Sequence, residues 1–365
     1  MSLSRPSPTH RQVYRRDASA PNTLTLTTEP LPGLGATELP PHSLLIRLHA
    51  IALNYRDINI LRGTNPWATL ATGIPCSDAA GTVIAAGSGV TRFSVGDRVS
   101  PILDQASVTG REQSREWLGG EVDGVLATHV VFDEEKVVRI PEGLTFAEAS
   151  VLPCAGVTAW SALAVGGEVG SGKVVLVQGT GGVSLLVLKL ALAAGCRVIV
   201  TSSSDEKLEK VRRIAGRYAD LVETINYKTN PKWEEEAVRL NGGKGVDIVI
   251  ENGGTSSLLQ SIAATAKRGI VSQVGYLGKQ DAKDLEGLIS ALIDKTVTLR
   301  GINVGSRLEF EALNQIVSAS RMRFEDLIDK TFAFEEAEEA FGYLKSQKHV
   351  GKVVIEIRLE VVEQT

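Results

Sequence analysis

The sequence predicts an α/β protein that joins a Rossmann-type, doubly wound parallel sheet to a separate β-rich domain. Two observations predict this fold. From about residue 144 to residue 304, apolar strands alternate with helical segments, which is typical of right-handed βαβ units and a parallel sheet. From about Leu24 to Arg139, short apolar runs are separated by Gly, Pro and Asp turns, which is typical of a β-rich domain.

The β-rich half is expected to begin with an edge strand or a frayed terminus in the polar stretch Met1–Arg16. Its clearest strands follow in the order Ser43–Ala52, Gly81–Ala86 and Gly96–Pro101. The stretch Leu103–Gly120 is polar and irregular, and we interpret it as a long surface loop. Long loops in compact domains are uncommon and often functional, so this loop is a candidate substrate lid.

The α/β half has strands that read as continuous apolar runs, such as VVLVQ and RVIVT, because helices cover both faces of such a sheet. The expected elements are, in order, helices Phe146–Val151 and Leu152–Leu163, strand Lys173–Gly179, helix Gly182–Gly195, strand Arg197–Thr201, helix Asp205–Ile214, strand Leu221–Asn226, helix Pro231–Leu240, strand Val246–Glu251, helix Ser256–Ala266, strands Gly269–Gly275 and Thr296–Val304, and then helices Glu309–Ser318 and Phe334–Lys345 and strand Lys352–Ile357. We therefore expect a β-rich domain of residues 1–153, to which residues 305–365 return, and a Rossmann domain of residues 154–304.

The composition is that of an ordinary globular protein, with 365 residues, 43% of them hydrophobic and 22% charged. The formal net charge of −4 gives no electrostatic reason to bind nucleic acid or anionic lipid. The three cysteines are widely spaced, which excludes a disulfide framework and is typical of a reducing compartment. The most apolar stretch, Leu185–Val200, contains Lys189 and Arg197, so we expect a buried helix and strand and no membrane span. The N-terminus lacks the apolar core of a secretory signal, and we expect a cytoplasmic protein.

A glycine-rich turn follows the first strand of the α/β half. That strand ends at Gln178, and the turn that leads into the next helix consists of Gly179, Thr180, Gly181, Gly182, Val183 and Ser184. The pattern is G-x-G-x-x-G with Ser in the third glycine position. Its first glycine allows a tight turn, its second lets the backbone approach a pyrophosphate, and its third permits close helix–strand packing. Between a strand and a helix, the turn predicts a dinucleotide whose pyrophosphate rests on the helix N-terminus.

The next strand distinguishes the two nicotinamide dinucleotides. NAD-binding proteins usually place an acid at this strand end to accept hydrogen bonds from the ribose hydroxyls. Here Ser202 and Ser203 occupy the position, and Lys207 follows a helical turn later. Hydroxyl donors and a cation suit a 2′-phosphate better than a free ribose, so we predict NADP. A plainer explanation stays open, in which Ser203 or Ser204 only caps the helix that starts near Asp205.

Several ordered motifs carry a family resemblance. They are Ala52-Leu53-Asn54-Tyr55-Arg56-Asp57, Asp78-Ala79-Ala80-Gly81-Thr82-Val83, Gly96-Asp97-Arg98-Val99, Leu152-Pro153-Cys154-Ala155-Gly156-Val157-Thr158-Ala159-Trp160, the glycine turn, and His349-Val350-Gly351-Lys352-Val353-Val354. Over nearly the whole chain they resemble the medium-chain dehydrogenase/reductase superfamily, and within it the zinc-independent branch of quinone and enoyl reductases. The resemblance implies that the β-rich domain is a GroES-like catalytic domain. It also implies a homodimer formed by edge-to-edge pairing of the α/β sheets through Thr296–Val304.

The resemblance also shows where this chain departs from the zinc alcohol dehydrogenases of the superfamily. Their zinc ligands stand where this chain has Asn54, Ser77 and Cys154, and only the cysteine is of the ligand type. The irregular loop carries no cysteine for a structural zinc lobe. A catalytic zinc needs three protein ligands, so we expect no zinc. We expect Asp78, which stands where those relatives carry an acid beside the metal, to pair with Arg56 or another cation.

The resemblance and the missing ligands together suggest a reaction. Without a metal, a hydride moves most easily to an activated C=C, whose negative charge spreads onto a conjugated carbonyl. The leading hypothesis is an NADPH-dependent reductase of enones, quinones or enoyl groups in a small-molecule substrate. Two alternatives stay open: a zinc-independent alcohol dehydrogenase or carbonyl reductase, and a cofactor-binding protein with little turnover.

The resemblance further implies residue roles. Tyr55 is the candidate donor to the developing oxyanion, although its ring could equally only pack against the nicotinamide, and Asn59 is a weaker candidate. Beyond the glycine turn and the strand end with its two serines and lysine, the residues expected to contact the cofactor are Asn54, Thr158, Tyr227, Gly275, Tyr276, Asn303 and Lys352.

Overall fold

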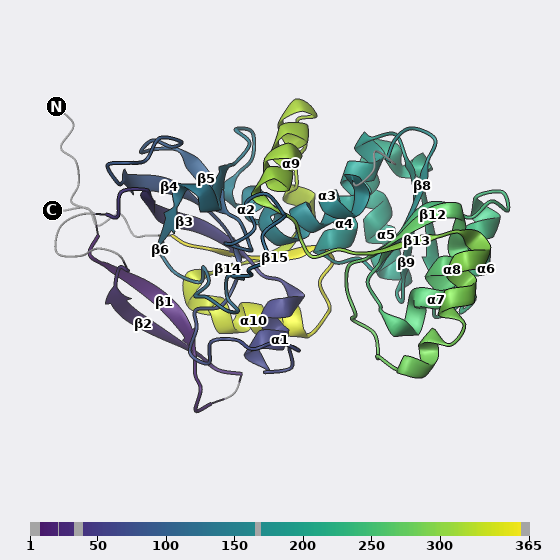
Figure 1. Cartoon of the computed structure of the whole chain (residues 1–365), viewed down its shortest axis with the longest axis horizontal. Helices are drawn as coiled ribbons and strands as arrows, with labels where there is room; N and C mark the ends of the chain where they lie inside the picture. The colour runs from purple at the N-terminus through teal and green to yellow at the C-terminus, as the bar shows by residue number, and fades with distance from the viewer. Residues whose placement is uncertain (1–7, 21, 33–38, 165–168, 359–365) are drawn as a thin grey trace. The chain divides into compact units, whose positions relative to one another are not determined.

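The chain forms two compact units (Figure 1). The computed structural model describes residues 8–20, 22–32, 39–164 and 169–358. The first unit consists of Met1–Cys154 and Gly305–Thr365, and the second of Ala155–Val304. The predicted boundary at residue 153 lies one residue before the observed one. Among the helices of the described ranges, none combines the length and apolar character that a membrane crossing requires.

The second unit is built on a six-stranded parallel sheet with the strand order β10-β9-β8-β11-β12-β13. Its strands are β8 (Val174–Gln178), β9 (Arg197–Ser202), β10 (Val222–Asn226), β11 (Val246–Glu251), β12 (Thr265–Gln273) and β13 (Thr298–Gly301). Its α-helices are α3 (Val157–Ala164), α4 (Gly182–Ala193), α5 (Asp205–Ala215), α6 (Trp233–Leu240), α7 (Thr255–Ala264) and α8 (Leu288–Lys295). The predicted Rossmann-type class is confirmed by this strand order.

Helices cover both faces of this sheet. On one face α4 contacts α3 and α5, and on the other α7 contacts α6 and α8 (Figure 1). The apolar strands are buried between the two helical layers, as their continuous runs predict. The chain runs outward from β8 through β9 to β10 and then returns to β11 on the other side of β8. The strand order therefore reverses between β8 and β11, and ligands of such sheets bind at the carboxyl ends of the strands beside this point.

The first unit is built on a seven-stranded sheet in which the order β14-β15-β3-β4-β5-β7 is joined by β6, which pairs with β3. Its strands are β3 (Ser43–Ala52), β4 (Asp78–Ala86), β5 (Arg98–Pro101), β6 (His129–Asp133), β7 (Val137–Arg139), β14 (Ile328–Ala333) and β15 (Lys352–Glu356), with β1 (His10–Arg16) and β2 (Leu24–Pro30) paired separately. Its α-helices are α1 (Tyr55–Leu61), α2 (Phe146–Ser150), α9 (Arg307–Ala319) and α10 (Ala337–Lys345). A π-helical turn, Leu152–Gly156, contains the boundary with the second unit.

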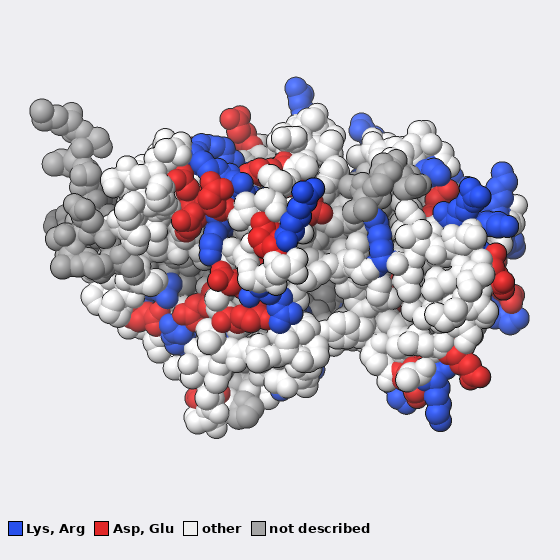
Figure 2. Space-filling model, viewed as in Figure 1, with Lys and Arg blue, Asp and Glu red and all other residues white. Residues whose placement is uncertain are grey.

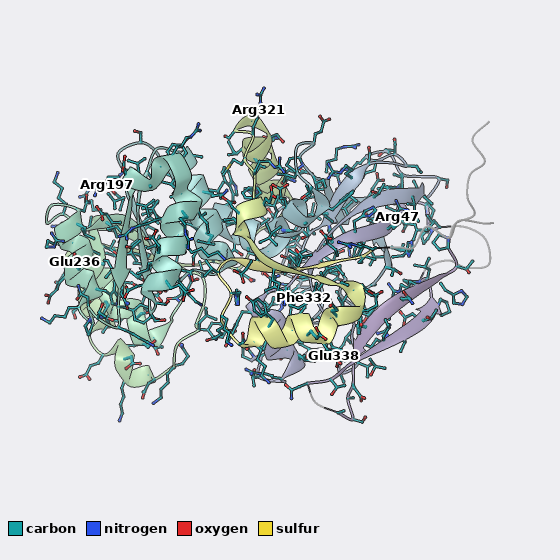
Figure 3. All side chains as sticks on the ribbon, turned by 180° about the vertical axis from the view of Figure 1, so that it is seen from behind. Arg47, Arg197, Glu236, Arg321, Phe332 and Glu338 are labelled. Carbon is teal, nitrogen blue, oxygen red and sulfur yellow. The ribbon has the colours of Figure 1, made fainter. Side chains whose placement is uncertain are left out.

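The C-terminal segment completes the core of the first unit. Residues of β3 and β15 are buried together in one apolar cluster, among them Ile46, Ile51 and Ile355. Helix α10 also holds the β1–β2 pair, because the carboxylate of Glu338 accepts a hydrogen bond from the amide of Leu24 at 3.1 Å (Figure 3). Acidic and basic side chains are intermixed on the face drawn in Figure 2.

One predicted strand needs correction, and two elements are not among those predicted. Strand Thr296–Val304 is shorter than predicted: the observed strand is Thr298–Gly301, and Thr296 and Val304 have positive φ values of +52° and +54°, outside the extended region. The hydrophobic pattern of the sequence does not predict α8, because some of its apolar residues are exposed, among them Ile289 and Ile293. It also does not predict β14, because only one of its six residues is buried. The first seven residues of Met1–Arg16 lie outside the described residues, and the rest of the stretch contains β1.

The irregular stretch Leu103–Gly120 is a loop, as predicted, with an exposed middle at 109–115. Its two ends are buried, and Trp117 donates its indole N–H to Asp104 at 3.1 Å. The loop also contacts the start of α9, because the amide of Arg307 donates to the carbonyl of residue 107 at 3.0 Å. The loop is therefore anchored at both ends and at residue 107, and its role as a lid stays a prediction.

Candidate functional site

The predicted cofactor residues of the second unit gather where its parallel strands end. Gly179 directly follows β8, and Ser202 is the last residue of β9. Tyr227 directly follows β10, Gly275 lies two residues after β12, and Asn303 lies two residues after β13. Because all six strands are parallel, their carboxyl ends share one edge of the sheet. Sheets of this type bind their ligands at this edge, beside the switch point.

The glycine turn has a geometry that packing within the protein does not explain. Gly179 has a φ of +78°, which favours glycine. Gly181 has an ordinary φ of −80°, and a Cβ built on it would meet no atom within 4 Å. Space without protein atoms at Gly181 fits a ligand that must approach the backbone closely. Gly181 is also the N-cap of α4 and supplies no side-chain cap, which leaves the amides of the first helical turn for an anion.

Ser184 stands in the third glycine position and is buried. Its hydroxyl donates to the carbonyl oxygen of Gln178 at 2.8 Å, and Asn252 Nδ2 donates to the same oxygen at 2.9 Å. The serine is therefore small enough for the helix–strand contact and adds a hydrogen bond that closes the turn on the end of β8. Its size is predictable from the sequence, but the hydrogen bond is not.

Glu251, the last residue of β11, is a site residue that the sequence analysis missed. Its side chain is fully buried. Its Oε1 accepts hydrogen bonds from the amides of Gly253 and Gly254 and from the Ser257 hydroxyl, and its Oε2 accepts from Gln178 Nε2 and from the Ser261 hydroxyl. This satisfied carboxylate ties the ends of β8 and β11 together at the switch point. The only sequence signal is an acid at the end of an apolar strand, followed by Asn and two glycines.

The end of β9 combines helix capping with partly exposed polar side chains. Ser204 caps α5, because its Oγ accepts from the amide of Lys207 at 3.3 Å, and Ser202 Oγ accepts from the amide of Ser204 at 3.4 Å. Capping therefore accounts for Ser204 but not for Ser203. The first acid after the strand, Asp205, accepts a hydrogen bond from Asn226 Nδ2 at 2.9 Å. This hydrogen bond occupies one carboxylate oxygen of Asp205, the acidic residue nearest to the end of β9 in the sequence.

The predicted cofactor residues of this unit differ in exposure. Tyr227, Tyr276 and Asn303 are exposed, whereas Thr158, Thr180 and Ser202 are buried, and Gly179, Gly181, Gly182, Val183, Ser203, Lys207 and Gly275 are intermediate. Thr158 lies on α3, and the amide of Gly275 donates to the carbonyl of Glu251 at 3.2 Å. Most of the predicted cofactor residues of this unit are therefore at least partly exposed. The exceptions are Thr158, Thr180 and Ser202, which are buried.

A polar cluster within the first unit surrounds a buried lysine, Lys352. Its ammonium donates to the carbonyl of Leu53 at 2.8 Å and to Oδ1 of Asn54 at 2.6 Å. It also lies 3.7 Å from Oδ2 of the fully buried Asp78. The resemblance suggests a cofactor contact for Lys352, whereas the structure shows its ammonium engaged by these three groups of the first unit.

Asp78 is the charged partner of Lys352 in this cluster. The expectation that Asp78 pairs with Arg56 or another cation is met by Lys352, since Arg56 instead donates to the carbonyl of residue 118 at 2.8 Å. Ser77 Oγ donates to Asp78 Oδ1 at 2.7 Å, and the amide of Cys154 donates to Oδ2 at 3.1 Å. Burial, together with the negative charge of Asp78, raises the pKa of the Cys154 thiol to about 12. Within the described ranges, no group of three or more His, Cys, Asp or Glu side chains is arranged to hold a metal.

Helix α1 starts directly after Asn54 and carries both predicted catalytic residues. The Asp57 carboxylate accepts from the amide of Asn54 at 2.8 Å, which fixes the start of the helix. Burial raises the pKa of Asp57 to about 6. Tyr55 and Asn59 are both partly exposed and, four residues apart, lie on the same side of α1.

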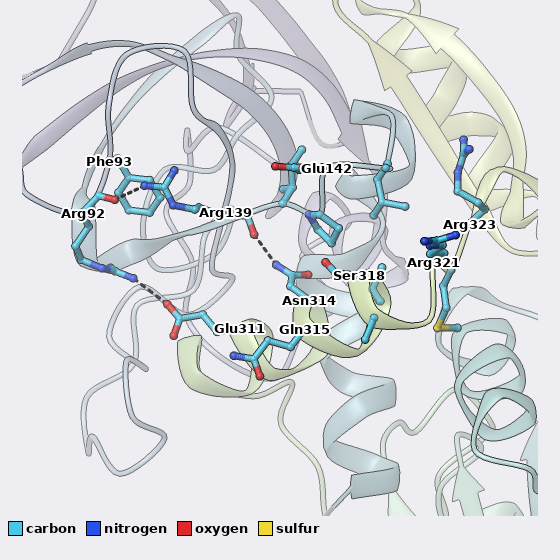
Figure 4. Close-up of a pocket in the computed structure, with 17 residues that line it drawn as sticks. Arg92, Phe93, Arg139, Glu142, Glu311, Asn314, Gln315, Ser318, Arg321 and Arg323 are labelled. Atoms are coloured by element: carbon cyan, nitrogen blue, oxygen red, sulfur yellow. Dashed lines mark hydrogen bonds and ion pairs between the residues drawn. The ribbon is translucent and has the colours of Figure 1, made fainter.

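A groove lies elsewhere on the first unit, between the segment 139–144 and α9 (Figure 4). Its volume is about 1330 Å³, and none of the predicted site residues lines it. Two of its arginines are paired with acids, Arg92 with Glu311 at 2.8 Å and Arg323 with Glu148 at 2.7 Å. We therefore do not assign this groove to hydride transfer.

Comparisons with known proteins identify relatives along most of the chain. Residues 182–319 match the family described as zinc-binding dehydrogenase, and residues 40–142 match the alcohol dehydrogenase GroES-like domain. The chain is 38% identical over 328 residues to a zinc-type alcohol dehydrogenase-like protein of Schizosaccharomyces pombe, covering 88% of this chain and 92% of that one. It is 27% identical over 322 residues to the acryloyl-coenzyme A reductase of Metallosphaera sedula, covering 86% and 91%. A solved structure from Sinorhizobium meliloti, named as an alcohol dehydrogenase, matches with a TM-score of 0.84 and 36% identity over 96% of this chain and 99% of that one.

Proposed function

Because this chain belongs to the medium-chain dehydrogenase/reductase superfamily, among the zinc-type alcohol dehydrogenase-like proteins, we propose a function within the NAD(P)-dependent oxidoreductase chemistry of that family. Our proposal is that the protein uses NADPH to reduce an activated C=C or a quinone of a small carbonyl compound, without zinc. The observation that carries it is the buried ammonium of Lys352, which lies 2.6 Å from Asn54 Oδ1 and 3.7 Å from Asp78 Oδ2.

The residues of this cluster do not fit a catalytic zinc ion. Of the three positions at which the resemblance puts zinc ligands, Asn54 and Ser77 are an amide and a hydroxyl, and both already hydrogen-bond within the cluster. Only the thiol of Cys154 remains, whereas Zn²⁺ in a catalytic site takes three protein ligands. A metal ion here would also be repelled by the nearby ammonium. These arguments support the zinc-independent part of the proposal.

The second unit supports the choice of NADPH as the cofactor. The open space at Gly181 and the uncapped start of α4 suit a pyrophosphate. At the end of β9, Asp205 accepts a hydrogen bond from Asn226, and Ser203 and Lys207 are both partly exposed. A hydroxyl and a cation suit a 2′-phosphate. When bound, NADPH supplies the hydride.

The chain itself must then stabilise the negative charge that develops on the substrate oxygen. We assign this donation to the hydroxyl of Tyr55, with Asn59 on the same side of α1 as the second candidate. A preorganised donor in a site that excludes water lowers the barrier most where charge develops in the transition state. The acryloyl-coenzyme A reductase among the relatives supports a C=C as the reduced bond.

A second candidate function is the reduction of a carbonyl or the oxidation of an alcohol, again without zinc. The name of the relative that is 38% identical over 328 residues, a zinc-type alcohol dehydrogenase-like protein, favours an alcohol or a carbonyl as the reacting group. A cofactor-binding protein with little turnover is the third outcome of the test below.

The test is steady-state oxidation of NADPH in the presence of an enone, a quinone or an aldehyde. The proposal predicts consumption with the enone or the quinone. Consumption with the aldehyde alone would establish the second candidate, and no consumption with any acceptor, despite NADPH binding, would leave a cofactor-binding protein.

We also propose that the protein is a homodimer joined through the β13 edge of the second unit. Strand β13 is the last strand of its sheet, and in the described residues it pairs only with β12. On the neighbouring helix α8, Ile289 and Ile293 are four residues apart and 69% and 67% exposed. An unpaired edge beside exposed isoleucines favours association with a second copy.

A further inference from the structure

The contact between Lys352 and Asn54 fixes which way the Asn54 amide points. An ammonium group can only donate hydrogen bonds, so the amide atom that faces it at 2.6 Å is the oxygen. The other end of the amide, Nδ2, therefore points away from the lysine. This orientation is maintained as long as Lys352 is charged and held in place.

Lys352 is held by its other contacts. It is 3% exposed, and its ammonium also reaches the carbonyl of Leu53 and the carboxylate of Asp78. Asp78 is held in turn by the hydroxyl of Ser77 and the amide of Cys154. A buried ammonium that is held by a carboxylate and by two hydrogen bonds has little freedom to move.

Asn54 Nδ2 is the donor in this cluster that lacks an acceptor. In the described part of the chain it is shielded from solvent and has no hydrogen-bond partner. A shielded donor without an acceptor is costly, and such groups in native proteins call for an explanation, of which a bound ligand is one. The residue as a whole is partly exposed, so the shielded amide lies near the surface of the first unit.

We infer that Lys352 is a positioning residue that orients and polarises the Asn54 amide, so that Nδ2 donates a hydrogen bond, in addition to that of the Tyr55 hydroxyl, to the carbonyl oxygen of the substrate as that oxygen becomes an enolate. A positive charge on Oδ1 withdraws electron density from the amide and strengthens the N–H donor. A strengthened donor acts most on an oxygen that gains negative charge, which is the substrate oxygen and not the neutral carboxamide of the cofactor. The ammonium thus acts through Asn54 without touching the substrate. The inference rests on the proposed function.

The chain offers a matched pair of variants. Asn54→Asp keeps an oxygen for Lys352 but removes the donor, whereas Lys352→Met keeps the Asn54 amide but removes the charge that orients it. We expect each to lower kcat for the enone by about 100-fold while changing the NADPH dissociation constant less than threefold. The double variant should lose no more than either single variant, because the two residues act in one chain. Lys352→Arg, which keeps the positive charge, should retain more of the wild-type kcat than Lys352→Met does.

Two controls separate this role from a structural one. Because Lys352→Met leaves Asp78 buried without a partner charge, Lys352→Met/Asp78→Asn is the second variant if the first fails to fold. Binding of a phenolate, as an enolate mimic, to the NADP⁺ complex gives a readout without turnover. Asn54→Asp should weaken it at least 10-fold.

The possible outcomes are distinct. If the wild-type protein turns over the enone and Asn54→Asp leaves both kcat and phenolate binding unchanged, the inference is overturned and the proposed function stands. If each variant raises the NADPH dissociation constant by the same factor by which it lowers kcat, Nδ2 donates its hydrogen bond to the cofactor carboxamide, and the inference is also overturned. If the wild-type protein turns over no acceptor, the proposed function and the inference both fail.

Discussion

Gln178 Nε2 donates to Glu251 Oε2 at 2.7 Å, and this bond joins the last residue of β8 to the last residue of β11. These two strands flank the point at which the strand order reverses, and the glycine turn starts at the next residue after Gln178. The geometry of the predicted pyrophosphate site therefore depends on a buried carboxylate that belongs to another strand.

Replacing this carboxylate should affect both folding and cofactor binding. Glu251→Gln puts an NH₂ group where the carboxylate oxygens accept five hydrogen bonds, so we expect a loss of about 2–4 kcal/mol in the free energy of unfolding. We also expect weaker NADPH binding. Urea unfolding and fluorescence titration measure the two effects. The control is Glu235→Gln on the exposed face of α6, which should change stability by less than about 0.5 kcal/mol.

Gly181→Ala should separate ligand space from protein packing. An added methyl meets no protein atom within 4 Å and φ is −80°, so only the change of N-cap costs stability, at most about 1 kcal/mol. The methyl would occupy the approach of the pyrophosphate, and NADPH binding should weaken at least about 10-fold, or about 1.4 kcal/mol. Gly342→Ala, in α10 with equally open space, should leave binding unchanged. Unchanged NADPH affinity in Gly181→Ala would contradict a pyrophosphate at this turn.

The NADP preference makes a prediction of its own. Lys207→Ala should weaken NADPH binding by about 10- to 100-fold, because a charge-assisted hydrogen bond to the 2′-phosphate is lost, and should leave NADH binding nearly unchanged. Titration of both reduced cofactors checks this. Lys232→Ala, at an exposed lysine before α6, is the control. Equal losses for NADPH and NADH would count against a 2′-phosphate at the end of β9.

Histidines of the first unit should make its stability depend on pH. Burial, with the positive charge of Arg47, lowers the pKa of His49 and His129 to about 4. Their folded pKa lies below the unfolded value, so their contribution is present above about pH 6.5 and is lost as the pH falls toward 4. For His129 the loss between pH 7.5 and 5 is at most about 2 kcal/mol. Urea unfolding should show that His129→Gln loses less stability over this range than the wild type; equal losses would contradict the shift.

The homodimer proposal can be tested with two surface substitutions. Ile289→Lys/Ile293→Lys puts charges beside the β13 edge and should convert a dimer of the 38.9-kDa chain into a monomer. Light scattering after size-exclusion chromatography gives the mass. Leu308→Lys, at an exposed leucine of α9 in the other unit, should leave the dimer intact. A wild-type monomer at micromolar concentration would contradict the proposal.

Much of the second unit is predictable from the sequence because its strands are buried on both faces. Runs such as Val174–Gln178 and Val246–Glu251 are apolar almost throughout, so they are easily identified as buried strands. The glycine turn identifies the strand before it as the first strand of the Rossmann sheet. Short or half-exposed elements carry less signal. Strand β14 buries only Phe332 fully, and α8 keeps isoleucines on its exposed side.

The candidate site is less predictable because it depends on contacts between distant residues. Lys352 lies nearly 300 positions after Asn54 in the sequence, and only the pairing of β15 with β3 brings the lysine beside the start of α1. The sequence predicts that Asp78 needs a cation but does not identify Lys352 as that cation. Glu251 likewise acquires its role only from the neighbouring strand.

The most direct test of the central claim measures zinc and hydride transfer on the same sample. Purified protein is analysed for zinc by mass spectrometry, and NADPH oxidation with an enone is followed before and after treatment with a chelator. We predict well under one zinc per chain and a rate that the chelator does not change. Stoichiometric zinc together with a rate that falls on chelation and returns when zinc is added would contradict the account.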